Sequence, residues 1–245
     1  MHYPQEFFAV QLEFAQRMTE LTQQPYLDAI LHNTAFYRIL GLDWSFDVSN
    51  PVWRAYCEGL RHEKGDLERT YQFYLARLDD IPEYDMAVQH WGCFAHEYLV
   101  DKQIVRLHFS GSLDRSGYGP LTSLRKEARI ADLRSLFTYV KERYPEARLV
   151  HGGSWLYNRK EYTRLFPTEY GQSAQADKKP HLTARGLWGQ FLRHDWSINE
   201  PIAASFRERL SQLHDVAAHP HCFPHQVMLT QAPIELFYRF YGIEV

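Results

Sequence analysis

The chain has 245 residues, 45% of them hydrophobic, and its 27 basic and 30 acidic side chains give a net charge of −3. This length allows one large domain or two small ones, each with a core that needs no disulfide or metal. The small acidic excess argues against a dedicated nucleic-acid-binding protein, and the 15% aromatic content argues against a long disordered tail.

The N-terminal residues and the cysteines indicate the cellular compartment in which we expect the protein. Residues 1–6 contain no basic segment followed by an apolar run, so we expect no secretory signal. No window approaches eighteen uncharged apolar residues, which predicts that the chain does not cross a membrane. Cys57, Cys93 and Cys222 are far apart and odd in number, as is typical of free thiols in a reducing compartment. We therefore expect a cytoplasmic protein.

The first eighty residues have the spacing of helices. Apolar residues recur at three- and four-residue steps over 5–23, which predicts a helix. Pro25 favours the start of a second helix, which we expect to continue to Gly41. Further helices are predicted to begin at Asn50 and Asp66. This part therefore reads as a helical N-terminal domain, which we bound at residues 1–82.

The pattern changes after residue 82. The expected elements are a strand at 104–109, a glycine-rich turn at 110–120, a helix at 121–143 and a strand at 147–151 ended by Gly152. Together they form a βαβ unit, whose crossover should be right-handed. Later helices are predicted to start at Asn158, Asn199 and Pro233, and we find no internal repeat. We therefore predict an α+β fold, with a mixed β-sheet and flanking helices over residues 83–245.

The turn before the long helix is a candidate phosphate site. A helix N-terminus offers free N–H groups, and glycines allow close approach of an anion. Arg125 and Arg129 lie one turn apart on the helix and could add positive charge. The alternative is a tight turn with solvated arginines. The candidate cofactor-binding residues are Arg115, Gly117, Tyr118, Gly119 and Arg125.

Two further candidates involve the strands. Ser154 and Trp155 follow the second strand at the edge where α/β sheets bind ligands, although they could simply end the strand. Arg106 and His108 are two residues apart in the first strand, so their side chains share one face of the sheet. If that face lines a cleft, His108 could act as a general base and Arg106 could bind an anionic group. If the face meets solvent, both are surface residues.

Two His- and Cys-containing segments could bind metal. His90, Cys93 and Glu97 would share one side of a helix, with His96 nearby, but no second ligand pair is evident. The segment 219–225 holds three histidines and Cys222, and its prolines favour a surface turn. We assign neither segment to a metal site.

The order of strand, glycine-bearing loop, long helix, strand and tyrosine-containing helix resembles the cofactor-binding core of GNAT-type acyltransferases. The resemblance covers residues 104 to about 170, and the whole chain is similar to an uncharacterised bacterial family without known activity. It implies a GNAT-like sheet and an acyl-CoA-dependent N-acyltransferase that uses acetyl-CoA or another acyl-CoA. It also implies that Gly117 and Gly119 bind the pyrophosphate, and that Tyr157 or Tyr162 reprotonates the CoA thiolate.

The residues and the resemblance leave two functions open. In the first, the protein transfers an acyl group to a small-molecule amine, with His108 or Glu97 as general base and Arg106, Ser154 and Trp155 binding substrate. In the second, it is a non-catalytic ligand-binding or protein-interaction protein on the same scaffold. The second is motivated by a loop with one residue too few after Arg115 and by Pro120, which has no N–H.

The aromatic residues separate into two groups. About half of them lie on helical stripes that we expect in the core. The remainder are predicted to line a pocket near the strand ends: Tyr118, Trp155, Tyr157, Tyr162 and Trp188.

Overall fold

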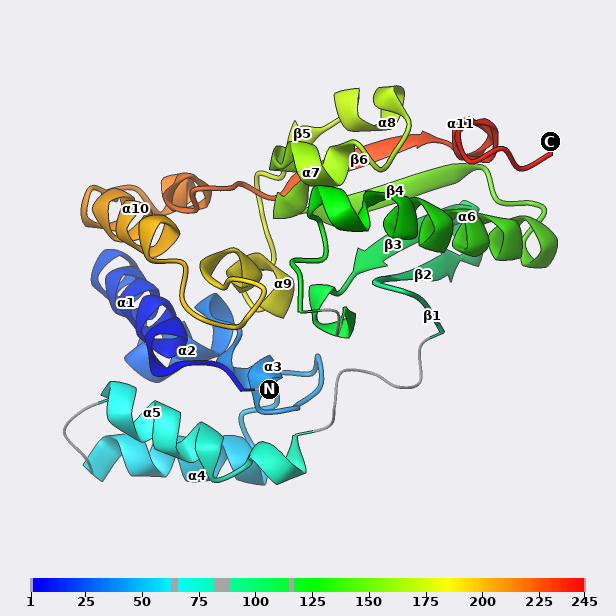
Figure 1. Ribbon diagram of the computed structural model, residues 1–245. Coiled ribbons are helices and arrows are strands. Elements are labelled where there is room, and N and C mark those ends of the chain that lie inside the picture. Colours follow the sequence, from blue (N-terminus) through cyan, green and yellow to red (C-terminus); the bar gives the residue numbers. More distant parts are fainter. Residues whose placement is uncertain (1, 63–65, 82–88, 115–116, 245) are drawn as a thin grey trace. The chain divides into compact units, whose positions relative to one another are not determined.

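A computed structural model describes residues 2–62, 66–81, 89–114 and 117–244 (Figure 1). The chain divides into two compact units, one made of residues 1–84 and 179–224 and the other of 85–178 and 225–245. The predicted α+β class, with a mixed sheet and flanking helices, is confirmed. The predicted division into 1–82 and 83–245 differs from these units in residues 179–224, which belong with the N-terminal helices.

The first unit is built around one helix. Its helices are α1 (Gln5–Thr22), α2 (Tyr26–Asn33), α3 (Phe36–Ile39), α4 (Pro51–His62), α5 (Asp66–Leu75), α9 (Arg185–Trp188) and α10 (Glu200–Ser211), with 3-10 turns η1 (Leu78–Asp80), η6 (Gly189–Phe191) and η7 (Val216–Cys222). On α1, the Phe8 ring contacts Phe36 and Tyr74. One and a half turns later, the Phe14 ring contacts Trp188 and Phe206. The helix α1 thus joins early and late parts of the chain in one core.

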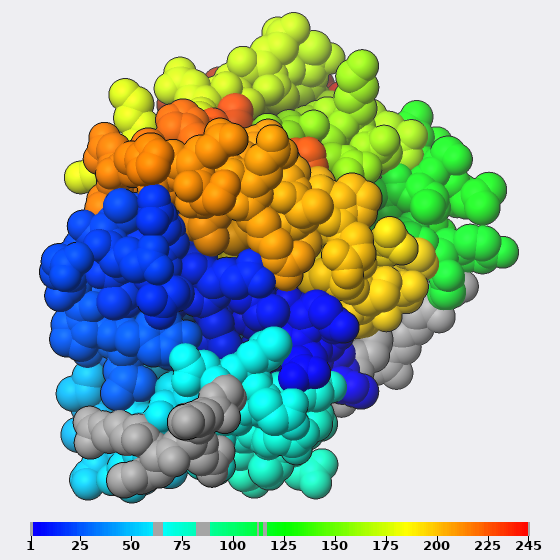
Figure 2. Space-filling view, turned by 90° about the vertical axis from the view of Figure 1, so that its left-hand side faces the viewer, coloured from blue at the N-terminus to red at the C-terminus, as the bar shows by residue number. Residues whose placement is uncertain are grey.

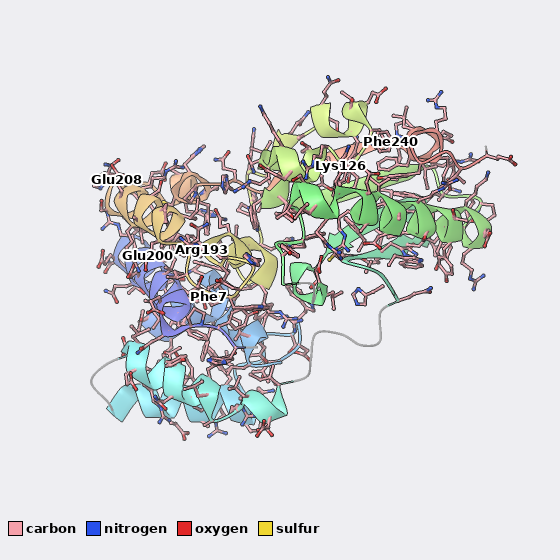
Figure 3. The ribbon with its side chains drawn as sticks, in the orientation of Figure 1. Phe7, Lys126, Arg193, Glu200, Glu208 and Phe240 are labelled. Carbon is pink, nitrogen blue, oxygen red and sulfur yellow. The ribbon has the colours of Figure 1, made fainter. Side chains whose placement is uncertain are left out.

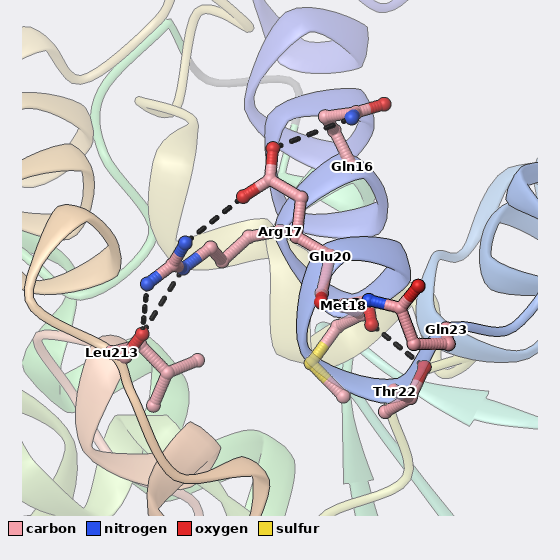
Figure 4. A network of polar contacts seen from close by, with 7 residues as sticks. All are labelled: Gln16, Arg17, Met18, Glu20, Thr22, Gln23 and Leu213. Atoms are coloured by element: carbon pink, nitrogen blue, oxygen red, sulfur yellow. Dashed lines mark hydrogen bonds and ion pairs between the residues drawn. The ribbon is translucent and has the colours of Figure 1, made fainter.

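A polar contact reinforces this joining. The guanidinium of Arg17 on α1 donates through Nε to the carbonyl oxygen of Leu213, just after α10, at 3.0 Å (Figure 4). The same side chain pairs with Glu20 at 2.9 Å. Figure 2 shows α10 in orange directly beside α1 in blue. The contact ties α1 to the segment that follows α10.

The predicted second helix is interrupted. Thr34 is extended, and its hydroxyl donates to the carbonyl of Ile30 at 2.6 Å and accepts from the N–H of Phe36 at 3.2 Å. The N–H of Ala35 donates instead to Oε1 of the buried Gln11 at 2.9 Å. These side chains compete for the backbone groups that a continuous helix would pair, and so two helices replace one.

Two segments of the first unit share a sequence pattern, which corrects our expectation that the chain has no internal repeat. Residues 32–60 and 181–210 match in order, with three extra residues before the Asp-Trp-Ser triplet of the second segment and two fewer after it. The identical pairs are His32 and His181, Thr34 and Thr183, Ala35 and Ala184, Asp43 and Asp195, Trp44 and Trp196, Ser45 and Ser197, Pro51 and Pro201, Glu58 and Glu208, and Leu60 and Leu210.

The two segments also share a local structure. Each has a four-residue helix, then the Asp-Trp-Ser turn, then a twelve-residue helix. In both turns the aspartate Oδ1 accepts from the serine N–H at 3.0 Å, Asp43 from Ser45 and Asp195 from Ser197. The second segment therefore forms the same helical element as the first, which explains why residues 179–224 belong to the helical unit.

The second unit is a six-stranded sheet in the order β1-β2-β3-β4-β6-β5. Its strands are β1 (His90–Trp91), β2 (Phe94–Leu99), β3 (Ile104–Phe109), β4 (Leu149–Ser154), β5 (Gln175–Ala176) and β6 (Met228–Pro233). Its helices are α6 (Lys126–Arg143), α7 (Lys160–Thr163), α8 (Thr168–Gln172) and α11 (Ile234–Phe240), with 3-10 turns η2 (Val100–Lys102), η3 (Gly111–Leu113), η4 (Ser123–Arg125) and η5 (Trp155–Asn158). Only β3 and β4 are parallel, and α6 connects them as predicted (Figure 1).

The sheet has two different faces. Side chains such as Phe94, Val105 and Val150 point into a core formed with α6, η5, α7, α8 and α11. The opposite face carries Glu97, Arg106 and His108, which are about half exposed. Within the described residues of the second unit, no helix covers this second face, which we call the open face.

Gln11 should matter more for stability than its polar side chain suggests. Gln11→Leu leaves the buried N–H of Ala35 without a partner, and we expect a loss of about 1–3 kcal/mol in the free energy of unfolding. Urea denaturation of this variant and of Gln16→Leu, an exposed position on the same helix, measures the difference. Equal stability of the two variants would contradict the account of the break between α2 and α3.

Candidate functional site

The parallel strands separate at their C-terminal ends. Their pairing stops at Leu107 and Gly152, although β3 continues to Phe109 and β4 to Ser154. The N–H of Ser110 donates to the carbonyl of Cys93 at 2.8 Å, so the backbone groups of Ser110 point toward β2. Successive residues of a strand direct their backbone groups to opposite sides, and the N–H and C=O of Phe109 therefore point toward β4, beyond the last parallel pair. We call this region the strand divergence.

On the open face, His108 lies beside an ion pair. Nη1 of Arg106 is 3.0 Å from Oε2 of Glu97, its cross-strand neighbour. Nε2 of His108 is 3.9 Å from the same oxygen. Partial burial lowers the pKa of His108, Glu97 opposes this shift, and Arg106 adds to it. The predicted pair Arg106 and His108 thus shares one face, with a neutral imidazole at neutral pH.

On the core side, tyrosine hydroxyls lie against the strand divergence. The hydroxyls of Tyr157 and Tyr170 are 2.8 Å apart. A Cβ at Gly152 would lie 1.9 Å from the first of these oxygens and 2.3 Å from the second. The ring of Tyr162 contacts Phe109 at the end of β3. These tyrosines therefore touch the ends of both strands from the face opposite His108.

The tyrosines are buried rather than pocket-lining. Tyr157 is 7% exposed and Tyr162 is 2% exposed. Burial raises the pKa of both phenols above the ordinary value, so both stay protonated at neutral pH. The structure thus places the two candidate acids in the core, where hydroxyl-to-hydroxyl contacts replace water.

The glycine-bearing loop is partly described. Arg115 lies outside the described residues, whereas Gly117 has a φ of +79°, which favours glycine. Tyr118 is 58% exposed. The N–H of Thr122 donates to the carbonyl of Gly119 at 3.1 Å, and η4 then leads into α6. The helix therefore starts at Lys126 (Figure 3), five residues later than predicted.

The two arginines of the predicted phosphate site are engaged within the protein. Oδ2 of Asp114, whose side chain is 1% exposed, is 3.0 Å from Arg125 and 3.2 Å from Arg129. Arg129 also lies 2.9 Å from Asp132 and donates to the thiol of Cys93. Burial raises the pKa of Cys93 to about 11, so the sulfur stays a thiol. Two carboxylates therefore neutralise two guanidiniums at this end of α6.

Ser154 and Trp155 shape the end of β4. Oγ of Ser154 accepts from the N–H of Leu156 at 3.1 Å and caps η5. The Trp155 ring stacks on His225 with centroids 5.8 Å apart. Both residues thus have local structural contacts, two and three positions beyond the last parallel pair.

Residues 90–97, whose His and Cys spacing would also fit one side of a helix, form β1, a turn and β2. Residues 216–222 form η7, in which Nδ1 of His219 lies 2.8 Å from the carbonyl of Val216. Within the described part of the chain, no three His, Cys, Asp or Glu side chains are grouped so as to hold a metal ion.

The predicted aromatic pocket is not formed as one cluster. Trp188 is fully buried in the first unit beside Phe14, whereas Tyr157 and Tyr162 lie in the core of the second. Two shallow depressions on the described surface lie away from these aromatic residues. One includes Arg239 and the half-exposed Phe240 (Figure 3), and the other includes Arg54 and Glu58 on α4.

Several site residues were not assigned from the sequence. Gly152 was read as the end of a strand, yet it provides the space that the tyrosine hydroxyls occupy. Tyr170 follows Tyr157 by thirteen residues and carries no local signal. Asp114 was visible in the glycine-rich turn, where an acidic side chain beside two arginines could have suggested an internal ion pair.

The space at Gly152 yields a sharp prediction. Gly152→Ala places a methyl group against two phenol oxygens, so we expect it to lower the free energy of unfolding by at least about 2 kcal/mol. Gly153→Ala is the matched control, because its Cβ would meet only Cδ2 of Leu229 at 3.3 Å. Urea denaturation of both variants is the measurement. Similar losses at the two glycines would contradict the packing described here.

Comparison of the chain with known proteins does not assign it to a family. Neither models of protein families, nor curated proteins, nor solved structures gave a match to the chain. None of the helices in the described ranges is long and apolar enough to span a lipid bilayer. Function must therefore be argued from the site alone.

Proposed function

We propose that the protein is an acyl-CoA-dependent N-acyltransferase that acts on a small-molecule amine at the strand divergence. The observation that carries the proposal is the position of two proton-transfer groups on opposite faces of one gap. His108 lies on the open face at the end of β3. Tyr157 lies on the core face against Gly152, the last residue of β4 that pairs with β3.

The backbone at the divergence supports binding of a thioester arm. The N–H and C=O of Phe109 are directed toward the gap, where the ladder to β4 has ended. An extended chain with amide groups could pair there as an added strand does. A carbonyl bound in this gap would meet backbone donors, which stabilise the charge that develops during acyl transfer.

The two side chains then have complementary roles. Acyl-CoA, when bound, supplies a thioester carbonyl and a thiolate leaving group. Glu97 favours the His108 tautomer with its proton on Nε2, which leaves Nδ1 to accept a proton from the attacking amine. As the new C–N bond forms and the C–S bond breaks, the Tyr157 hydroxyl gives its proton to the sulfur. The products are an amide and a thiol, and proton return from His108 to Tyr157 restores the protein.

The residues around the start of α6 fit the phosphate groups of acyl-CoA less well. Arg125 and Arg129 already pair with Asp114 and Asp132, and Pro120 offers no N–H. Among the described residues, Gly117 and Gly119 remain as anion-binding elements, because the N–H of Lys126 at the start of α6 donates to the carbonyl of Ser123. The proposal therefore assigns phosphate binding to backbone amides rather than to these arginines.

The proposal includes a cytoplasmic location. Cys93 and Cys222 are buried and form no disulfide. Such thiols suit a reducing compartment.

Calorimetry and kinetics test the proposal together. Titration with acetyl-CoA and with longer acyl-CoAs should show binding below millimolar concentration. His108→Gln should then lower kcat for acyl transfer by about 10²- to 10⁴-fold, because general-base catalysis contributes that much. His181→Gln, an exposed position in the first unit, is the control. No binding of any acyl-CoA at millimolar concentration would rule the proposal out.

The pH profile tests the identity of the base. Partial burial lowers the pKa of His108 below its ordinary value of about 6.5, so the ring is neutral at neutral pH. We expect the acidic limb of kcat/KM to be centred below that ordinary value, because protonation of His108 removes the base. An acidic limb centred above pH 7 would contradict this assignment.

A non-catalytic ligand-binding or interaction protein on the same scaffold is the second candidate. It is favoured by the internal neutralisation of Arg125 and Arg129 and by the burial of Tyr157. This candidate predicts that acyl-CoA neither binds nor reacts. The calorimetric titration above therefore distinguishes the two functions.

A further inference from the structure

A polar row crosses the open face of the sheet. Its members occupy matching register positions on four neighbouring strands, so their side chains share one face. The row consists of Glu97 on β2, Arg106 on β3, His151 on β4 and Gln231 on β6. His108 lies in the next row, toward the strand divergence.

The row has one charge of each sign. Arg106 and Glu97 form an ion pair in which the side chains are 42% and 48% exposed. Such half-exposed pairs contribute little stability, so a ligand can replace one partner at small cost. Burial lowers the pKa of His151, and Arg106 and Lys102 add to this shift, so the imidazole is neutral at neutral pH. The row thus offers one guanidinium, one carboxylate and the neutral imidazole of His151, with the neutral imidazole of His108 in the next row.

We propose that the amine acceptor is an amino acid, whose carboxylate binds Arg106 while its amino group reaches His108. This inference rests on the proposed function, because it assigns the second substrate of that reaction. The positions of Arg106 and His108 are about 7 Å apart along β3. Two hydrogen bonds of about 3 Å allow one small zwitterion to span that distance.

The charge pattern favours a zwitterion over a simple amine. Arg106 presents a planar fork of N–H donors that matches a carboxylate with two parallel hydrogen bonds. Glu97 attracts the ammonium group and is 3.9 Å from His108, which accepts the proton. A monoamine would use only Glu97 and His108, and would leave the guanidinium unmatched. The pairing therefore selects amines that carry a carboxylate close to the nitrogen.

Matched substrates test the selection. Acetyl transfer from acetyl-CoA to glycine is compared with transfer to methylamine, and transfer to leucine with transfer to 3-methylbutylamine. We expect kcat/KM to be at least about tenfold higher for each amino acid, the contribution of one good charge-assisted contact. Arg106→Gln should abolish this preference by raising KM for the amino acids, with kcat changed less than threefold. Arg106→Lys should give an intermediate preference.

The control variant is Arg134→Gln, on α6, which packs against the opposite face of the sheet. It should keep the preference of the unmodified protein. Equal rates for glycine and methylamine would overturn the amino-acid assignment and leave acyl transfer standing. The same holds if Arg106→Gln retains the preference.

A binding measurement separates this inference from the proposed function. In the absence of acyl-CoA, NMR titration with glycine should shift the imidazole signals of His108 and His151, and methylamine at the same concentration should shift them less, because it leaves Arg106 unmatched. Arg106→Gln should remove the response to glycine. If acetyl-CoA fails to bind or react, the proposed function fails, and this titration alone still decides whether the open face takes a zwitterion. An absent response to glycine overturns the inference.

Discussion

The contact between Gly152 and two tyrosine hydroxyls organises the second unit. Parallel pairing between β3 and β4 ends at this glycine, and the oxygens of Tyr157 and Tyr170 occupy the place of its missing side chain. Any larger residue would displace the phenols from the core. The contact therefore holds η5 and α8 against the sheet at the point where the two strands separate.

This arrangement places different chemistry on the two faces of the sheet. The core face has protonated phenols that are shielded from water, whereas the open face has neutral imidazoles beside the Glu97–Arg106 pair. The gap between the strand ends joins the two environments. Near the start of α6, by contrast, Asp114 and Asp132 pair with Arg125 and Arg129 within the protein. Arg129, whose side chain is 5% exposed, is therefore less accessible to a ligand than Arg106 on the open face, whose side chain is 42% exposed.

The sequence predicted β3 with its observed bounds, because alternation of apolar and polar residues is a local signal. It missed β2, whose histidine and cysteine spacing also fits a helix, and so the pairing of Glu97 with Arg106 could not be foreseen. Helix periodicity placed α1 and α10 correctly, but not the break at Thr34, which depends on the distant Gln11. The packing of residues 179–224 with the N-terminal helices depends on contacts between distant parts of the chain, such as those of Phe14 with Trp188 and Phe206, which no local pattern indicates.

The most direct test of the account is a backbone NMR titration of the full chain with acetyl-CoA. The account predicts that the amide signals of Phe109 and Gly153, on either side of the strand divergence, shift with saturable binding. The side-chain Nε–H signals of Arg125 and Arg129 should shift less, because their guanidinium groups stay paired with the two aspartates. Shifts confined to other parts of the sheet, or no shift at millimolar acetyl-CoA, would contradict the claim that the divergence is the acyl-binding site.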